Sequence, residues 1–69
     1  MTRITLLIPS HNIIIKLNYE PEYKEYLIKV NDTDILTRTT VKYEAIKRFD
    51  TIVSLLNILG IHYELEYHI

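Results

Sequence analysis

Apolar side chains recur at every second position in several segments of this 69-residue chain, and one long segment has a different period. A period of two is typical of β-strands with one buried face, because successive side chains on a strand point to opposite sides. Residues 41–59 repeat their apolar side chains every three or four positions instead, which is the spacing of an amphipathic helix. The pattern therefore predicts a β-sheet accompanied by a single helix.

Short runs of turn-forming residues separate the alternating segments. We predict strands over residues 3–8, 13–19, 24–31 and 61–69, and leave open a short additional strand over 35–39. Proline, asparagine and aspartate favour turns between these segments. The side chains expected to face inward are Ile4, Leu6, Ile8, Ile13, Ile15, Leu17, Tyr19, Tyr26, Ile28, Val30, Ile61, Tyr63, Leu65, Tyr67 and Ile69.

The helical segment has recognisable signals at both ends. Gly60, the one glycine in the sequence, stands where a left-handed C-cap is favoured, and Thr39 or Thr40 is the expected N-cap. With Ile46 and Leu55 included, the apolar stripe spans about half of the helix circumference, more than contact with one sheet requires. The other members of the stripe are Val41, Ala45, Phe49, Ile52, Val53, Leu56 and Leu59.

These elements define the predicted fold class. We expect a small two-layer α+β domain of order β-β-β-(β)-α-β, in which a mostly antiparallel sheet of four or five strands carries one helix on one face. Residues 1–69 are expected to form one domain. A chain this short buries only ~60% of its unfolded surface. Because the sequence has no cysteines and 48% hydrophobic residues, we expect a dense core and association with a partner.

The charge balance bears on location and partners. The formal net charge is −1, which provides no electrostatic attraction to nucleic acid or to an anionic membrane. No segment approaches the ~20 consecutive apolar residues of a spanning helix, and the apolar run before Pro9 is too short for a signal peptide. We therefore expect a cytoplasmic protein that does not bind membranes.

One helix can cover only one face of the sheet. The other, outer face is expected to carry an apolar patch surrounded by basic side chains, which would mark a binding surface because monomers rarely expose large apolar patches. The alternative is that these apolar side chains lie at edges and stay isolated. The candidate binding residues are Leu7, Ile14, Lys16, Leu27, Lys29, Leu36 and Arg38.

Four potential metal ligands share one face of the last predicted strand: His62, Glu64, Glu66 and His68. A His-x-Glu pair can converge on one ion, but six residues separate the two histidines by ~20 Å. The interpretation we favour is a solvated strand face without metal. If this strand paired with its own copy about Leu65, Glu64 would lie opposite Glu66 twice, whereas a two-residue shift would bring His62 opposite Glu66.

The sequence offers no recognisable catalytic motif. Neither Ser10 nor Ser54 stands in a nucleophile motif, and His11 next to Ser10 does not make a triad. A chain with one glycine has no phosphate-binding loop. We expect no enzymatic activity, no cofactor and no small-molecule substrate.

The expected function is that of a small protein–protein interaction module whose partner is its own copy, in a homodimer, or a larger host protein. It would present a sheet face, a sheet edge or the broad helix stripe. Small size and abundant residues with AT-rich codons suggest a regulatory or inhibitory protein of a virus or mobile element, of the anti-defence type such as an anti-CRISPR. The alternative is a small nucleic-acid-binding regulator that acts as a dimer, which salt-sensitive binding would distinguish.

Overall fold

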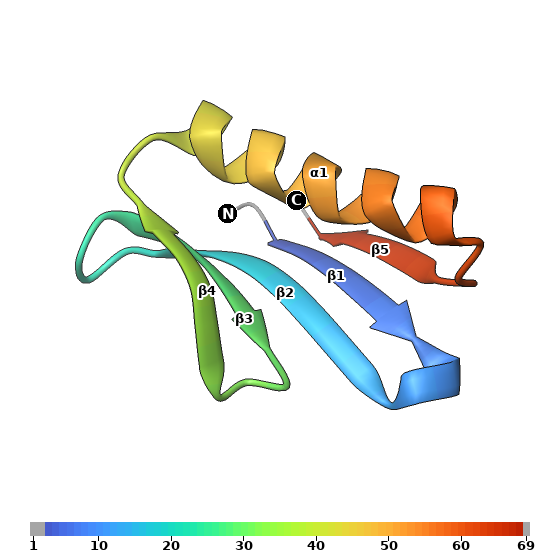
Figure 1. Ribbon diagram of the computed structural model, residues 1–69. Helices are drawn as coiled ribbons and strands as arrows, with labels where there is room; N and C mark the ends of the chain where they lie inside the picture. The colour runs from blue at the N-terminus through green and yellow to red at the C-terminus, as the bar shows by residue number, and fades with distance from the viewer. Residues whose placement is uncertain (1–2, 69) are drawn as a thin grey trace.

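The computed structural model describes residues 3–68 and has the predicted architecture, a twisted antiparallel sheet with one helix across one face (Figure 1). Its elements are β1 (Arg3–Ile8), the short 3-10 helix η1 (Pro9–His11), β2 (Ile13–Glu20), β3 (Glu25–Val30), β4 (Asp34–Thr39), α1 (Lys42–Leu59) and β5 (Glu64–His68). The α+β fold class is thereby confirmed, and the strand left open over 35–39 exists as β4. Within residues 3–68, no helix has the length and apolar character needed to cross a membrane.

The five strands lie in the order β4-β3-β2-β1-β5, and every neighbouring pair is antiparallel. Three consecutive hairpins form the first four strands. The chain then crosses the sheet through α1 and adds β5 beside β1. Among the described residues, β4 and β5 are therefore the two edge strands.

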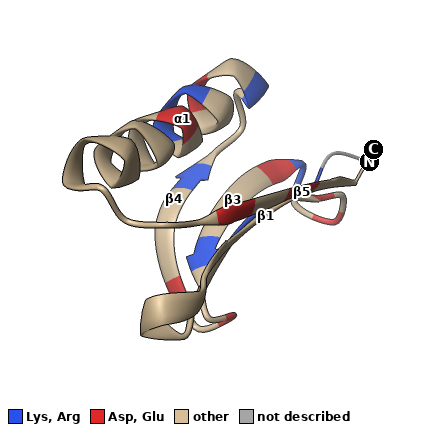
Figure 2. Cartoon of the chain, turned by 90° about the vertical axis from the view of Figure 1, so that its right-hand side faces the viewer, with Lys and Arg blue, Asp and Glu red and all other residues tan. Residues whose placement is uncertain are grey.

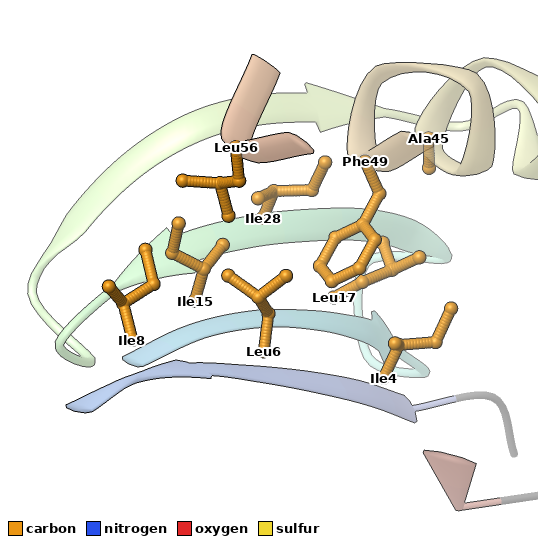
Figure 3. Close-up of a cluster of buried hydrophobic side chains, with 9 residues drawn as sticks. All are labelled: Ile4, Leu6, Ile8, Ile15, Leu17, Ile28, Ala45, Phe49 and Leu56. Atoms are coloured by element: carbon orange, nitrogen blue, oxygen red, sulfur yellow. The ribbon is translucent and has the colours of Figure 1, made fainter. Parts of the chain in front are cut away.

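The hydrophobic core lies between α1 and the sheet (Figure 3). Leu6, Leu17 and Ile28 are its fully buried centre, and each stands at an alternating position of its strand. The helix contributes Ala45, Phe49 and Leu56, and the remaining buried members of the cluster are Ile4, Ile8 and Ile15. The inward positions predicted for β1, β2 and β3 are confirmed as buried or packed against this cluster, except Tyr19, which is half-buried and has its ring centroid 4.8 Å from that of Tyr26 with the rings tilted by 52°.

The ends of α1 are fixed by two local arrangements. The N-cap position is Val41, so the expectation of Thr39 or Thr40 as N-cap is wrong by one or two residues. The Thr39 hydroxyl still serves this end, because it accepts the Val41 N–H at 3.1 Å and donates to Glu44 Oε2 at 3.2 Å. At the other end Gly60 has the predicted left-handed conformation, with φ of 70°.

The last strand begins later than predicted. The N–H of Ile61 donates to the carbonyl of Leu56 at 2.9 Å to close the helix, so this segment is not available to a strand ladder. Tyr63 donates its hydroxyl hydrogen to Asn57 Oδ1 at 2.9 Å, which ties the connection to the helix. Strand β5 therefore starts at Glu64, and the inward position predicted for Ile69 lies outside the described residues.

Two apolar positions of the predicted helical stripe are exposed instead: the N-cap Val41 (48% exposed) and Leu59 (68%) at the last position of α1. Val41 is the N-cap and Leu59 is the last helical residue, so both stand at the ends of the helix, outside the segment between its buried residues Ala45 and Leu56.

Strand β4 contains an irregularity that changes its faces. Ile28 pairs with Thr37 and Lys29 pairs with Ile35, so Leu36 is an extra residue in a β-bulge. The bulge places Thr37, which is buried, on the side of the helix. It leaves Ile35 opposite Lys29 on the outer face.

Candidate functional site

The outer sheet face has an apolar centre smaller than the sequence predicts. Leu7 lies directly opposite Ile14 on the neighbouring strand. The Leu7 side chain is half-buried, and Ile14 is 38% exposed. Together with Thr5 they line a shallow depression of about 220 Å³ whose remaining walls are Glu64 and Glu66 of β5. This groove can accept an apolar group beside two carboxylates.

Leu27 does not contribute to this surface, which corrects the expectation of an exposed side chain there. It is only 6% exposed, although it lies on the outer face opposite Arg38. Arg38 reaches diagonally along the sheet to Glu25, and its Nε lies 2.7 Å from Glu25 Oε2. Because Arg38 is the direct cross-strand partner of Leu27 and its guanidinium reaches Glu25, its aliphatic stem is placed to cover Leu27.

The remaining candidates on this face are dispersed rather than brought together. Leu36 is 53% exposed, but it lies at the bulge of the edge strand β4. Lys16 and Lys29 are direct cross-strand partners, an unfavourable pairing of like charges that Lys16 relieves by an ion pair with Asp32 at 3.3 Å. Their role in binding a partner remains a prediction.

The four potential metal ligands of the C-terminal segment form two separate pairs. His62 Nε2 lies 3.8 Å from Glu64 Oε2, and His68 Nε2 lies 3.4 Å from Glu66 Oε2. No group of three or more such side chains that could hold a metal ion occurs in the described part of the chain. Each pair is therefore at most half of a coordination sphere.

Ser10 and His11 make a close contact in η1, with the Ser10 Oγ 2.7 Å from His11 Nδ1. A nucleophile and base of this kind need a third group to orient the imidazole and a pocket for the substrate. Both residues are exposed on a surface turn, and His11 donates no hydrogen bond to a carboxylate within residues 3–68. We therefore interpret the Ser10–His11 contact as a local contact within a surface turn and not as part of a catalytic site.

The solvent side of α1 changes character along its length. Its N-terminal turns carry charged residues, and Asp50 is the last of them, so residues 51–59 bear no charge (Figure 2). Large apolar side chains are nevertheless exposed there: Leu55 is 52% exposed, Ile58 79% and Leu59 68%. These three residues stand at i, i+3 and i+4, so they are neighbours on the helix surface. We refer to them as the helix ridge.

The sequence indicated part of the helix ridge and missed Ile58. The broad stripe included Leu55 and Leu59 but assigned Leu59 to the core, and it omitted Ile58. The uncharged run 51–59 is the signal that could have found it, because the exposed side of a surface helix is normally polar. Comparison with protein-family models, with curated proteins and with solved structures gives no significant match to this chain.

Proposed function

We propose that this protein is a small non-enzymatic protein–protein interaction module that binds another protein through the helix ridge. The observation that carries the proposal is the simultaneous exposure of Leu55, Ile58 and Leu59 on adjacent turns of α1. An apolar stripe at i, i+3 and i+4 is the usual way in which a helix docks into a groove of a partner. The partner would therefore offer an apolar groove at least about one and a half helical turns long.

The biological role we propose is regulatory or inhibitory, in the cytoplasm, for a virus or mobile element. Small size, the absence of cysteine and the abundance of residues with AT-rich codons support this part of the proposal. Inhibitors of defence systems, such as anti-CRISPR proteins, belong to this class. Binding to a larger protein is the mode of action that an exposed ridge on so small a domain favours.

The test is capture of partners on immobilised protein with a matched pair of variants. Ile58→Lys places a charge in the centre of the ridge, and Tyr43→Lys places the same charge on exposed helix surface about 22 Å away, near the other end of α1. We expect wild type and Tyr43→Lys to retain the same protein, and Ile58→Lys to lose it. Equal capture by all three would overturn the assignment of the ridge.

The same experiment separates the nucleic-acid alternative. Two of the basic residues it relies on, Lys16 and Arg38, are already engaged by Asp32 and Glu25. Binding through phosphates weakens steeply with salt, whereas an apolar ridge is largely indifferent to it. Partner capture that survives both nuclease and high salt supports the protein-binding proposal, and capture lost under either treatment supports the alternative.

A further inference from the structure

The two edges of the sheet differ in how well they could accept another strand. On β4 the bulge at Leu36 interrupts the ladder. Bulges on edge strands bend the edge and hinder pairing with further strands. On β5 the register with β1 runs without a break from Glu64 opposite Leu7 to His68 opposite Arg3. Strand β5 is therefore the regular edge in the described part of the sheet.

The helix-side face of β5 is incompletely covered. Leu65 and Tyr67 lie opposite Leu6 and Ile4 of the core, so their side chains point to the side of α1. The helix packs mainly on β2, β3 and β4. As a result Leu65 is only half-buried and Tyr67 is 65% exposed. An additional strand beside β5 would cover both.

A second copy of β5 can pair with the described residues of this strand in more than one antiparallel register, and the side chains brought opposite each other distinguish them. One register is centred on Glu66. It sets Glu64 opposite His68 twice and Leu65 opposite Tyr67 twice. The two Leu–Tyr pairs would lie on the helix-side face, and the two Glu–His pairs on the outer face.

Pairing centred on Leu65 is less favourable, because it sets Glu64 opposite Glu66 at both ends of the contact. In the register centred on Glu66, the one unfavourable contact is between the two Glu66 side chains. These are 72% exposed, so water and ions screen much of their repulsion. Charge complementarity therefore favours the second register.

We propose that the protein forms a homodimer in which β5 pairs antiparallel with β5 of a second copy, centred on Glu66, to give one continuous ten-stranded sheet. The inference involves a different surface from the helix ridge, so it does not depend on the proposed function. Either can fail without affecting the other.

The register is tested by disulfide formation, for which the cysteine-free chain provides a clean background. Glu66→Cys would bring its sulfur opposite that of the second copy, at a separation suited to a disulfide. Glu64→Cys is the matched control on the same face of the same strand. In the proposed register the two copies of residue 64 are about 13 Å apart, beyond the reach of a disulfide.

We expect Glu66→Cys to form a covalent dimer at least about tenfold faster than Glu64→Cys under mild oxidation. Equal rates would indicate pairing centred on Leu65 and would overturn the proposed register. Failure of both variants to crosslink at high protein concentration would overturn the dimer itself.

Sedimentation of the unmodified chain supplies the second measurement. The mass should rise with concentration from the 8.3 kDa of one chain towards that of two. Tyr67→Lys puts a charge on the helix-side face of the contact and should abolish this rise, while circular dichroism confirms that the exposed position tolerates it. Ile58→Lys on the helix ridge should leave the rise unchanged. If Ile58→Lys abolished association and Tyr67→Lys did not, the copies would associate through the helix ridge, and the proposed β5 contact would be wrong.

Discussion

Asn31 and Ile14 exchange two hydrogen bonds beyond the end of β3. The Asn31 N–H donates to the Ile14 carbonyl at 2.8 Å, and the Ile14 N–H donates to Asn31 Oδ1 at 2.9 Å. Asn31 itself has a left-handed backbone, with φ of 52°. Its side chain thus takes over the acceptor role that a strand carbonyl would have, at a position where the chain already turns towards β4.

This relationship predicts different costs for two substitutions at one position. Asn31→Gly keeps the left-handed conformation and loses one hydrogen bond, so we expect a loss of about 1 kcal/mol in the free energy of unfolding. Asn31→Ala loses the bond and also strains the backbone, for a total of about 2 kcal/mol. Urea denaturation of both variants measures the difference. Equal losses in the two variants would show that the left-handed backbone at residue 31 does not destabilise alanine relative to glycine.

Lys24 also has a left-handed backbone, with φ of 53°, but its side chain has no short polar group that would favour this conformation. Lys24→Gly should therefore raise the free energy of unfolding by about 1 kcal/mol. Lys24→Ala removes the same side chain without relieving the backbone and serves as the control. Thermal melting of wild type, Lys24→Gly and Lys24→Ala tests this prediction. A similar increase in stability for Lys24→Ala would show that removal of the lysine charge, and not relief of the backbone, is the cause.

The pair of Arg38 and Glu25 should act as a unit that protects Leu27. Glu25 Oε2 is shielded from water and makes no well-aligned hydrogen bond, so the Arg38 guanidinium at 2.7 Å is its compensating charge. Arg38→Ala should cost about 1–2 kcal/mol, because it leaves a shielded carboxylate without a partner. Adding Glu25→Ala should recover part of that loss in a double-mutant cycle. Strictly additive losses would contradict the coupling.

The start of α1 offers a test with a built-in control. Thr39→Ala removes both the acceptor for the Val41 N–H and the hydroxyl that donates to Glu44, and should cost about 1 kcal/mol. Thr40→Ala changes the adjacent exposed threonine and should be close to neutral. Chemical denaturation distinguishes the two. The reverse order of effects would transfer the capping role to Thr40.

Ile14 tests whether the outer sheet face takes part in partner binding. It lies opposite Leu7, on the side of the sheet away from α1, and its exposure makes a charge tolerable. We expect Ile14→Lys to fold normally and to retain any partner that Ile58→Lys loses. If Ile14→Lys also prevented capture, the Leu7–Ile14 groove would have to be part of the binding surface.

Local patterns were sufficient for much of the fold. The recurrence of apolar residues at every second position identified Leu6, Leu17 and Ile28 as inward-facing, and these are the fully buried side chains. Gly60 located the end of the helix because the left-handed conformation there suits glycine. These features depend on near neighbours in sequence, so a period and one residue type were enough to predict them.

The errors concern features that depend on distant parts of the chain. The burial of Leu27 depends on Arg38, a residue on the next strand that reaches across to Glu25. The exposure of Leu59 depends on where the sheet ends beneath the helix, which helical periodicity does not contain. A bulge such as that at Leu36 shifts the alternation by one residue, and a segment as short as β4 gives too few repeats to detect the shift.

The bulge at Leu36 would also limit how far the proposed assembly can proceed. A sheet with two regular edges can add copies without limit and grow into a fibre. In the proposed dimer the regular edge β5 would be consumed by the first partner, and each outer end of the combined sheet would be a bulged β4. A single inserted residue, on the edge farthest from β5, would thus stop such an assembly at two copies.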